Sequence, residues 1–155
     1  MVTTLQEEIK QTKPFSSLEQ EAHLSVIRTA AILMDEVEKF LRPYEITGTQ
    51  YNVLRILRGA EPDGLCRNEV RDRMLTRMPD MTRLLDRMED AGLVVRSRER
   101  DDRRMVLTRI SPRGQKLLAD IDDAVQKEHK TRFNRLNDSE LRTVIELLAK
   151  VRQKG

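Results

Sequence analysis

Arginine is concentrated in the middle third of this chain. Between Arg67 and Arg113 there are 13 arginines, no lysine and 9 acidic residues, so this stretch carries +4 while the rest of the chain sums to −1. A guanidinium group offers a planar fork of donors that matches phosphates and guanine edges, which a lysine ammonium does not. The charge distribution by itself is equally compatible with a nucleic-acid contact and with a solvated, salt-bridged helical surface.

The segment from Arg96 to Gly114, RSRERDDRRMVLTRISPRG, adds a strand pattern to this arginine content. Beyond its charged tip the residues alternate with period two, so that Leu107 and Arg109 face one way and Thr108 the other. A helix start follows at once at Ser111-Pro112. A two-stranded ribbon with a basic tip suits a nucleic-acid groove better than a hydrophobic core.

Two short helices are predicted before this ribbon. The first covers about 67–75, and after a turn near Thr76 the second begins with Pro79 as its first helical residue. Its apolar side chains follow the spacing i, i+3, i+4, i+7: Met81, Leu84, Leu85 and Met88. Gly92 is expected to end this helix. Two helices and a ribbon in this order predict a winged helix-turn-helix.

Longer amphipathic helices are predicted on both sides of that unit. Capping-box patterns at 16–19, 47–50 and 137–140 mark helix starts. Aromatic residues are only 3% of the chain, so a self-contained core would be thin, and we expect the outer helices to dimerise through their apolar stripes. The expected fold class is mainly α with a small two- or three-stranded wing.

The expected organisation has three parts. Residues 1–15 form a flexible N-terminal arm, residues 16–45 and 112–155 form a helical dimerisation region, and residues 46–111 form the winged helix-turn-helix domain. No apolar run reaches the roughly 18 residues of a membrane span and the N-terminus has no signal-like apolar stretch. We therefore expect a cytoplasmic protein without a membrane contact.

The wing pattern resembles that of the MarR (multiple antibiotic resistance regulator) family of bacterial transcription factors. The family signature is D-x-R, five residues, L-T, two residues, G. Here it begins at Asp102-Arg103-Arg104 and ends at Gly114, with Ile110-Ser111 in place of Leu-Thr. Residues 82–94 (TRLLDRMEDAGLV) resemble the family's recognition helix and its turn into the wing. The resemblance covers 16–151 and implies a winged helix-turn-helix regulator.

The resemblance also implies roles for the wing residues. Asp102 and Arg104 are expected to brace the wing, because they lie two apart and would share a face of an extended strand. Arg103 would project the other way. It is our candidate for the minor groove, since a narrow, negative groove attracts arginine.

The recognition helix supplies the remaining DNA candidates. Helix-turn-helix proteins contact bases mainly from the N-terminal part of this helix. Thr82 and Arg83 are therefore the expected base contacts, and Arg77 and Arg87 are expected on phosphates or flanking bases. Asp80 could accept a hydrogen bond from cytosine, but complementing the helix N-terminus is the preferred interpretation.

Signals for an effector are weaker. Many members of the family sense small aromatic or anionic compounds, and His23 and Tyr51 are the residues that could line such a pocket. Cys66 at a helix start could instead serve redox sensing, since a helix N-terminus and a nearby arginine favour a thiolate, although a tolerated Ser-like cap is the simpler interpretation. Two histidines 106 positions apart and one cysteine offer no metal site.

These features together predict a homodimeric, sequence-specific DNA-binding regulator of a pseudo-palindromic operator. A repressor released by a small-molecule effector is the expected form. The alternatives are a winged-helix protein-interaction module and a redox-responsive regulator that uses Cys66. No nucleophile–base motif or phosphate-binding glycine loop is present, so neither an enzyme nor a cofactor is expected.

Overall fold

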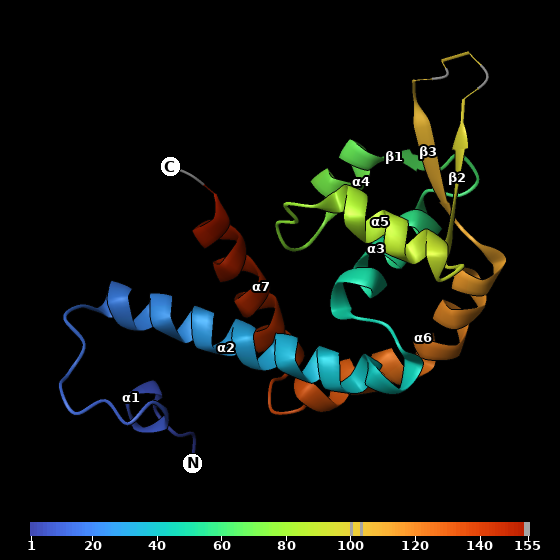
Figure 1. The fold of residues 1–155 in the computed structure, drawn as a ribbon. Helices are drawn as coiled ribbons and strands as arrows, with labels where there is room; N and C mark the ends of the chain where they lie inside the picture. Colours follow the sequence, from blue (N-terminus) through green and yellow to red (C-terminus); the bar gives the residue numbers. More distant parts are fainter. Residues whose placement is uncertain (100, 103, 154–155) are drawn as a thin grey trace.

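The computed structural model describes residues 1–99, 101–102 and 104–153. In chain order the elements are α1 (Leu5–Glu8), α2 (Leu18–Leu41), the 3-10 turn η1 (Arg42–Tyr44), α3 (Gly48–Gly59), β1 (Leu65–Cys66), α4 (Arg67–Arg73), α5 (Met81–Asp90), β2 (Val94–Arg98), β3 (Val106–Ile110), α6 (Pro112–Arg132) and α7 (Asp138–Arg152). Figure 1 shows α2, α7 and the end of α6 gathered away from a lobe of shorter elements, from which the β2–β3 ribbon projects.

The strands form one antiparallel sheet in the order β1-β3-β2. Strand β2 pairs with β3 from Val94 opposite Ile110 to Arg98 opposite Val106. Strand β1 adds a two-residue pairing on the other side of β3. The expectation of a mainly helical fold with a small wing is confirmed, and the wing sheet has three strands.

Most of the buried core lies in the lobe. Its fully buried side chains come from α3, α4, α5, β2 and α6, and include Val53, Leu57, Val70, Leu85, Met88, Val94 and Leu118. Helix α7 buries none of its residues, and α2 buries only Leu41. Among the described residues, no helix has the length and apolar character needed to cross a membrane.

Helix starts follow the predicted capping chemistry with two corrections. The capping box expected at 16–19 is not what begins α2. The N-cap is Ser17, whose hydroxyl accepts from the backbone N–H of Gln20. Helix α5 begins at Met81 with Asp80 as its N-cap, so Pro79 is not its first residue. The expected boxes at 47–50 and 137–140 and the cap at Ser111 are all present.

The N-terminal arm contains a short ordered turn. Helix α1 is closed by a capping box between Thr4 and Glu7. Glu8 at its end lies 3.7 Å from the guanidinium of Arg28 on α2. The arm thus has one ionic contact with the long helix beside it.

Candidate nucleic-acid interface

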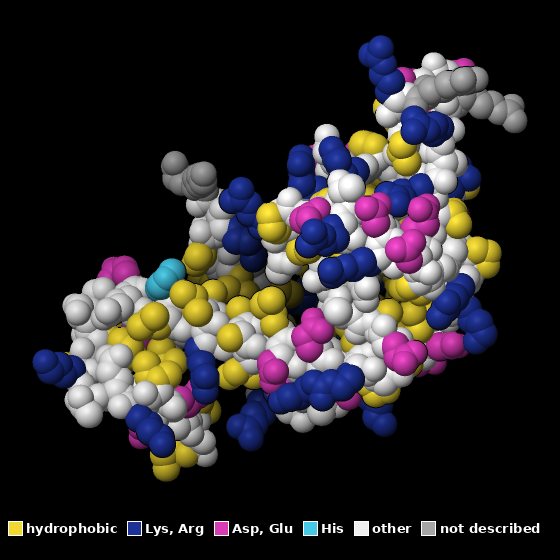
Figure 2. Space-filling model, in the orientation of Figure 1, with side chains coloured by type: hydrophobic (Ala, Val, Ile, Leu, Met, Phe, Trp, Pro, Cys, Tyr) yellow, Lys and Arg dark blue, Asp and Glu magenta, His cyan; other side chains and the backbone are white. Residues whose placement is uncertain are grey.

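The faces of α5 are those predicted from its spacing. Met81, Leu85 and Met88 are buried against the lobe, and Arg83 and Arg87 are exposed. Buried residues at this helical spacing occupy one face of α5, which leaves the opposite face for solvent or a partner. In Figure 2, Lys and Arg side chains surround α5 and continue along the wing, with acidic side chains interspersed.

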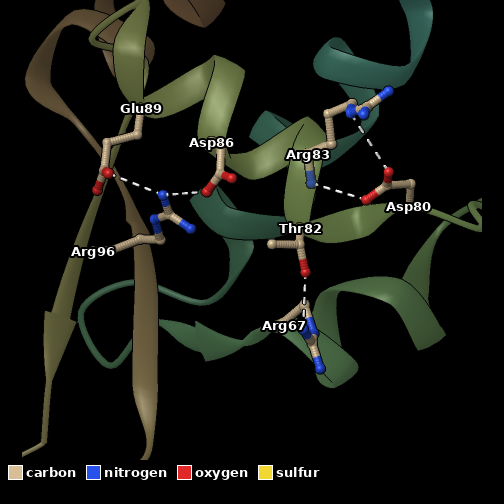
Figure 3. A network of polar contacts seen from close by, with 7 residues as sticks. All are labelled: Arg67, Asp80, Thr82, Arg83, Asp86, Glu89 and Arg96. Atoms are coloured by element: carbon tan, nitrogen blue, oxygen red, sulfur yellow. Dashed lines mark hydrogen bonds and ion pairs between the residues drawn. The ribbon is translucent and has the colours of Figure 1, made fainter.

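The N-terminus of α5 is held by polar contacts (Figure 3). Asp80 accepts from the backbone N–H of Arg83 at 3.0 Å, and its other oxygen lies 3.6 Å from the Nε of Arg83. This confirms the capping interpretation of Asp80. Thr82 accepts a hydrogen bond of 2.8 Å from Arg67, the first residue of α4. The two expected base contacts are thus oriented by neighbours on both sides.

Arg77 lies in the turn before α5 and Arg87 in its last turn, and both are exposed. Neither has an ion pair to another described residue. Both side chains are therefore open to solvent, and Arg87 shares a face of α5 with Arg83, which lies one turn before it. That placement fits the phosphate contacts expected of them.

One contact between α5 and the wing was not foreseen from the sequence. Arg96 of β2 reaches two carboxylates one turn apart on α5, Asp86 at 2.6 Å and Glu89 at 2.9 Å (Figure 3). The hydrogen bonds to Glu89 and then Asp86 raise the pKa of Arg96, and the bond from Arg96 lowers the pKa of Glu89. The available signal was an acidic pair at spacing i, i+3 on the helix preceding a basic strand position.

The tip of the wing corrects the expectation for its bracing pair. Asp102 and Arg104 lie between β2 and β3 and outside both strands, so they do not share the face of an extended strand. Asp102 instead accepts from the backbone N–H of Arg104 at 2.9 Å, and its carbonyl accepts from the N–H of Met105 at 3.0 Å. The pair is connected through the backbone. Arg103, our minor-groove candidate, lies outside the described residues.

Arg104 borders a hollow between the wing and the helix-turn-helix. The hollow has a volume of about 460 Å³, and Arg67, Asn68, Thr82 and Met105 also line it. Cys66 lies at its edge as the half-buried N-cap of α4, and its backbone N–H donates to Glu69 at 2.8 Å. Hydrogen bonds from the backbone and then the side chain of Cys66 lower the pKa of Glu69. The cysteine therefore has a carboxylate as well as an arginine beside it.

The base of the wing is fastened to the end of α5. Ser111 caps α6 by accepting from the N–H of Gly114 at 3.0 Å and donates at 2.6 Å to the carbonyl of Gly92. A Cβ on Gly114 would lie 2.4 Å from the carbonyl oxygen of Leu93. Gly92 has a φ of 74°, as expected of a helix-ending glycine. The last glycine of the wing signature is thus required by close backbone packing.

A second cavity lies between the outer helices and the lobe. It has a volume of about 220 Å³ and mainly apolar walls, and its polar lining comes from Glu36, Tyr51, Glu128, His129 and Arg132. Arg132 and Glu36 form an ion pair, and burial raises the pKa of Tyr51. Of the two residues expected at an effector pocket, only Tyr51 lines this cavity. His23 is exposed on α2 and is not among its lining residues.

Comparisons with known proteins agree with this geometry. A MarR family model matches residues 44–105. The solved structure of a MarR transcription factor from Planctomyces limnophilus is 37% identical, covers 88% of this chain and 98% of its own, and superposes with a TM-score of 0.67. The transcriptional regulator FarR of Neisseria gonorrhoeae is 27% identical over 89% of this chain and 93% of its own length.

Two other similar structures were solved with ligands. Staphylococcus aureus MepR, in complex with DNA, is 23% identical, with a TM-score of 0.73 over 82% of this chain and 93% of its own. NadR, in complex with 4-hydroxyphenylacetate, is 27% identical, with a TM-score of 0.68 over 90% of this chain and 97% of its own. The family is one of transcription regulators and not of enzymes. The chain belongs to the MarR family of winged helix-turn-helix, DNA-binding transcriptional regulators.

Proposed function

We propose that this protein is a cytoplasmic, homodimeric repressor that binds a pseudo-palindromic operator and is released by a small aromatic anion. The observation that supports a dimer is the solvent exposure of the apolar side chains of α7. None of its residues is buried, and Ile145, Leu148 and Val151, spaced three residues apart, are 65%, 37% and 73% exposed. Exposed apolar side chains at helical spacing need a partner, and a second copy of the same helices supplies one.

The same outer helices set the position of the lobes. In a two-fold dimer the two α5 helices would enter successive major grooves, about one helical turn apart. Arg83 and Thr82 would read base edges, Arg77 and Arg87 would contact phosphates or flanking bases, and Arg103 would enter the minor groove. This arrangement predicts an operator with two related half-sites.

Selection of bound sites from a random duplex pool tests this proposal. We expect the recovered sites to show two-fold symmetry and the affinity to fall steeply with added salt, because phosphate contacts release counterions. A winged-helix module that binds only proteins would recover no site and show no salt dependence. Placing a recovered site over a promoter for in vitro transcription then distinguishes repression from activation.

The cavity beside Tyr51 is the proposed effector site. Its aromatic and aliphatic walls suit a ring, and the Tyr51 hydroxyl can donate a hydrogen bond. An acidic group on the ligand would meet His129, and would meet Arg132 only by displacing its partner Glu36, with Glu128 also in the lining. The relative NadR in complex with 4-hydroxyphenylacetate supports this chemistry. An effector releases DNA only if it binds the DNA-incompetent arrangement more tightly, since equal affinity for both shifts nothing.

Calorimetric titration with 4-hydroxyphenylacetate and substituted benzoates tests the site. We expect Tyr51→Phe to weaken binding, and Tyr44→Phe to leave it unchanged because Tyr44 does not line the cavity. Equal effects of the two substitutions would place the effector elsewhere. An oxidant that removes DNA binding from the native protein but not from Cys66→Ser would favour the redox alternative.

A further inference from the structure

Among the described residues, ion pairs between the wing and the recognition helix are made by Arg96 of β2. Alternation along β2 turns Val94 and Arg96 to the same side of the strand. Val94 is buried in the core, and Arg96, two residues further from it, reaches along the helix to Asp86 and Glu89. The side chain of Arg96 is 23% exposed to solvent. It therefore lies at the margin of the core, where the wing leaves the lobe.

Arg96 and its two carboxylate partners form charge-assisted hydrogen bonds with one another. The guanidinium of Arg96 donates to two carboxylates, and the pKa directions of Arg96 and Glu89 keep the pair ionised at physiological pH. A charge-assisted contact with two acceptors fixes orientation as well as distance. Arg96 thus differs from Arg87 and Arg104, whose side chains are exposed on the same lobe.

The surroundings of Arg96 make it unsuited to bind a phosphate. A phosphate that approached it would meet the carboxylates of Asp86 and Glu89, and like charges repel. The same contact covers two acidic groups on a helix that is expected to lie against DNA. Arg96 therefore serves the interface through the position of the wing and not through a DNA contact of its own.

We propose that Arg96 is a positioning residue that fixes the angle between the wing and α5, and with it the spacing between their contacts in neighbouring grooves. This inference rests on the proposed function, in which α5 reads the major groove and the wing the minor groove. When two contacts are rigidly connected, the second forms at a high effective concentration once the first is made. If the wing moves independently of α5, the second contact no longer forms at this high effective concentration. The resulting loss of affinity is greatest on sites with the correct groove spacing.

The experiment compares Arg96→Ala with the double variant Asp86→Asn, Glu89→Gln. Each protein is titrated on a duplex selected from a random pool and on a shuffled duplex of equal length. We expect Arg96→Ala to lower the ratio of specific to non-specific affinity about tenfold. The control Arg135→Ala removes the same charge from the exposed connection between α6 and α7 and leaves the ratio unchanged.

The double variant separates positioning from direct binding. It removes two negative charges, so affinity for the shuffled duplex should rise, yet the ratio should fall as it does for Arg96→Ala. Hydroxyl-radical protection in the minor groove should weaken while methylation protection in the major groove persists. If the double variant instead binds the selected site more tightly with full minor-groove protection, Arg96 binds phosphate directly and the inference is overturned.

Two further measurements keep the inference independent of the variants' folding and of the proposed function. The charge swap Arg96→Glu with Glu89→Arg restores the ion pair and should recover part of the minor-groove protection. In the absence of DNA, amide exchange in β2 should accelerate in Arg96→Ala; unchanged exchange would overturn the inference. Native protein that recovers no site from the pool would overturn the proposed function alone, because the amide-exchange result would still stand.

Discussion

The DNA-binding lobe and the outer helices bury their apolar residues in opposite ways. Within the lobe, α3, α4, α5 and the strands cover one another, and their buried side chains are at most 7% exposed. Along α2 and α7, by contrast, Ile27, Met34, Ile145 and Val151 are all more than half exposed. Figure 2 shows hydrophobic side chains gathered along α2 and beside α7. The lobe buries apolar residues from several elements within one chain, whereas the outer helices leave many of theirs exposed.

This difference assigns separate tasks to the two regions. A lobe with its own core can hold Thr82 and Arg83 in fixed positions before DNA arrives, which lowers the ordering cost of binding. Helices that depend on a partner can change their packing when a ligand enters the cavity between them and the lobe. Under the proposed function, recognition would therefore reside in the lobe and regulation in the outer helices, whose packing could change.

The largest expected effect comes from breaking the outer helices. The double change Ile145→Asp, Val151→Asp places charges on the exposed apolar face of α7 and should give a monomer in analytical ultracentrifugation. Affinity for a two-half-site duplex should fall about 100-fold or more, because the second half-site no longer benefits from the first. Circular dichroism should still show a cooperative transition for the lobe.

A matched control for that change is Val95→Asp, which alters an apolar residue 49% exposed on β2. It should remain dimeric. A dimer that persists in the double variant would mean that the apolar face of α7 is not the interface.

The next largest effect is expected within the recognition helix. Arg83→Ala removes the candidate base contact and should weaken binding to the selected site by about 1–3 kcal/mol, or roughly 5- to 150-fold. The sequence preference at one position of each half-site should relax. Gel-shift titration measures the affinity, and a repeated selection measures the preference. A loss of affinity that is uniform across all sequences would show that Arg83 contacts a phosphate instead.

A smaller effect, confined to stability, is expected at the base of the wing. Gly114→Ala forces a Cβ against the carbonyl of Leu93 and should destabilise the fold by about 1–3 kcal/mol, measured by denaturant unfolding. Gly59→Ala is the control, because a Cβ there meets nothing within 4 Å and should not destabilise. Equal effects of the two changes would exclude the close approach as the reason for Gly114.

The smallest effect is a pH dependence at Glu89. Its pKa is lowered from 4.5 by the bond from Arg96, so its contribution to stability is present above pH 4.5 and is lost as the pH falls through the lower, folded-state value. The difference in unfolding free energy between the native protein and Glu89→Gln should be about 0.2–1 kcal/mol near neutrality. It should shrink below pH 4.5 and be absent in an Arg96→Ala background.

Periodicity and capping chemistry predicted much of this molecule because they act within single elements. The stripe from Met81 to Met88 settled which face of α5 is buried, and Ser111 and Gly92 marked its neighbouring boundaries. The start of α5 was placed wrongly at Pro79. Proline fits a first helical position, but Asp80 can also bond to the backbone of the first turn, and that side-chain cap determined the boundary.

What the sequence could not supply was the packing of one element on another. The contact of Arg96 depends on the angle between β2 and α5, which no local pattern encodes. His23 was chosen by residue type, yet it precedes Leu33, the first α2 residue of the cavity, by about 15 Å of helix. The wing turn similarly replaced the extended pairing expected of Asp102 and Arg104, because a reversal of the chain had to fit between the paired strands.

Helix α6 begins at the Ser111 cap and ends beside the cavity at Arg132. Its 21 residues span about 30 Å. If the helix moves as a rigid rod about its cavity end, a tilt of about 5° carries its first turn by nearly 3 Å. Because the Ser111 hydroxyl also holds the carbonyl of Gly92, that displacement would reach the wing and the recognition helix together. Under the proposed function, the serine cap would then couple the cavity to both DNA-reading elements, and a ligand that tilted α6 slightly would misalign the two together.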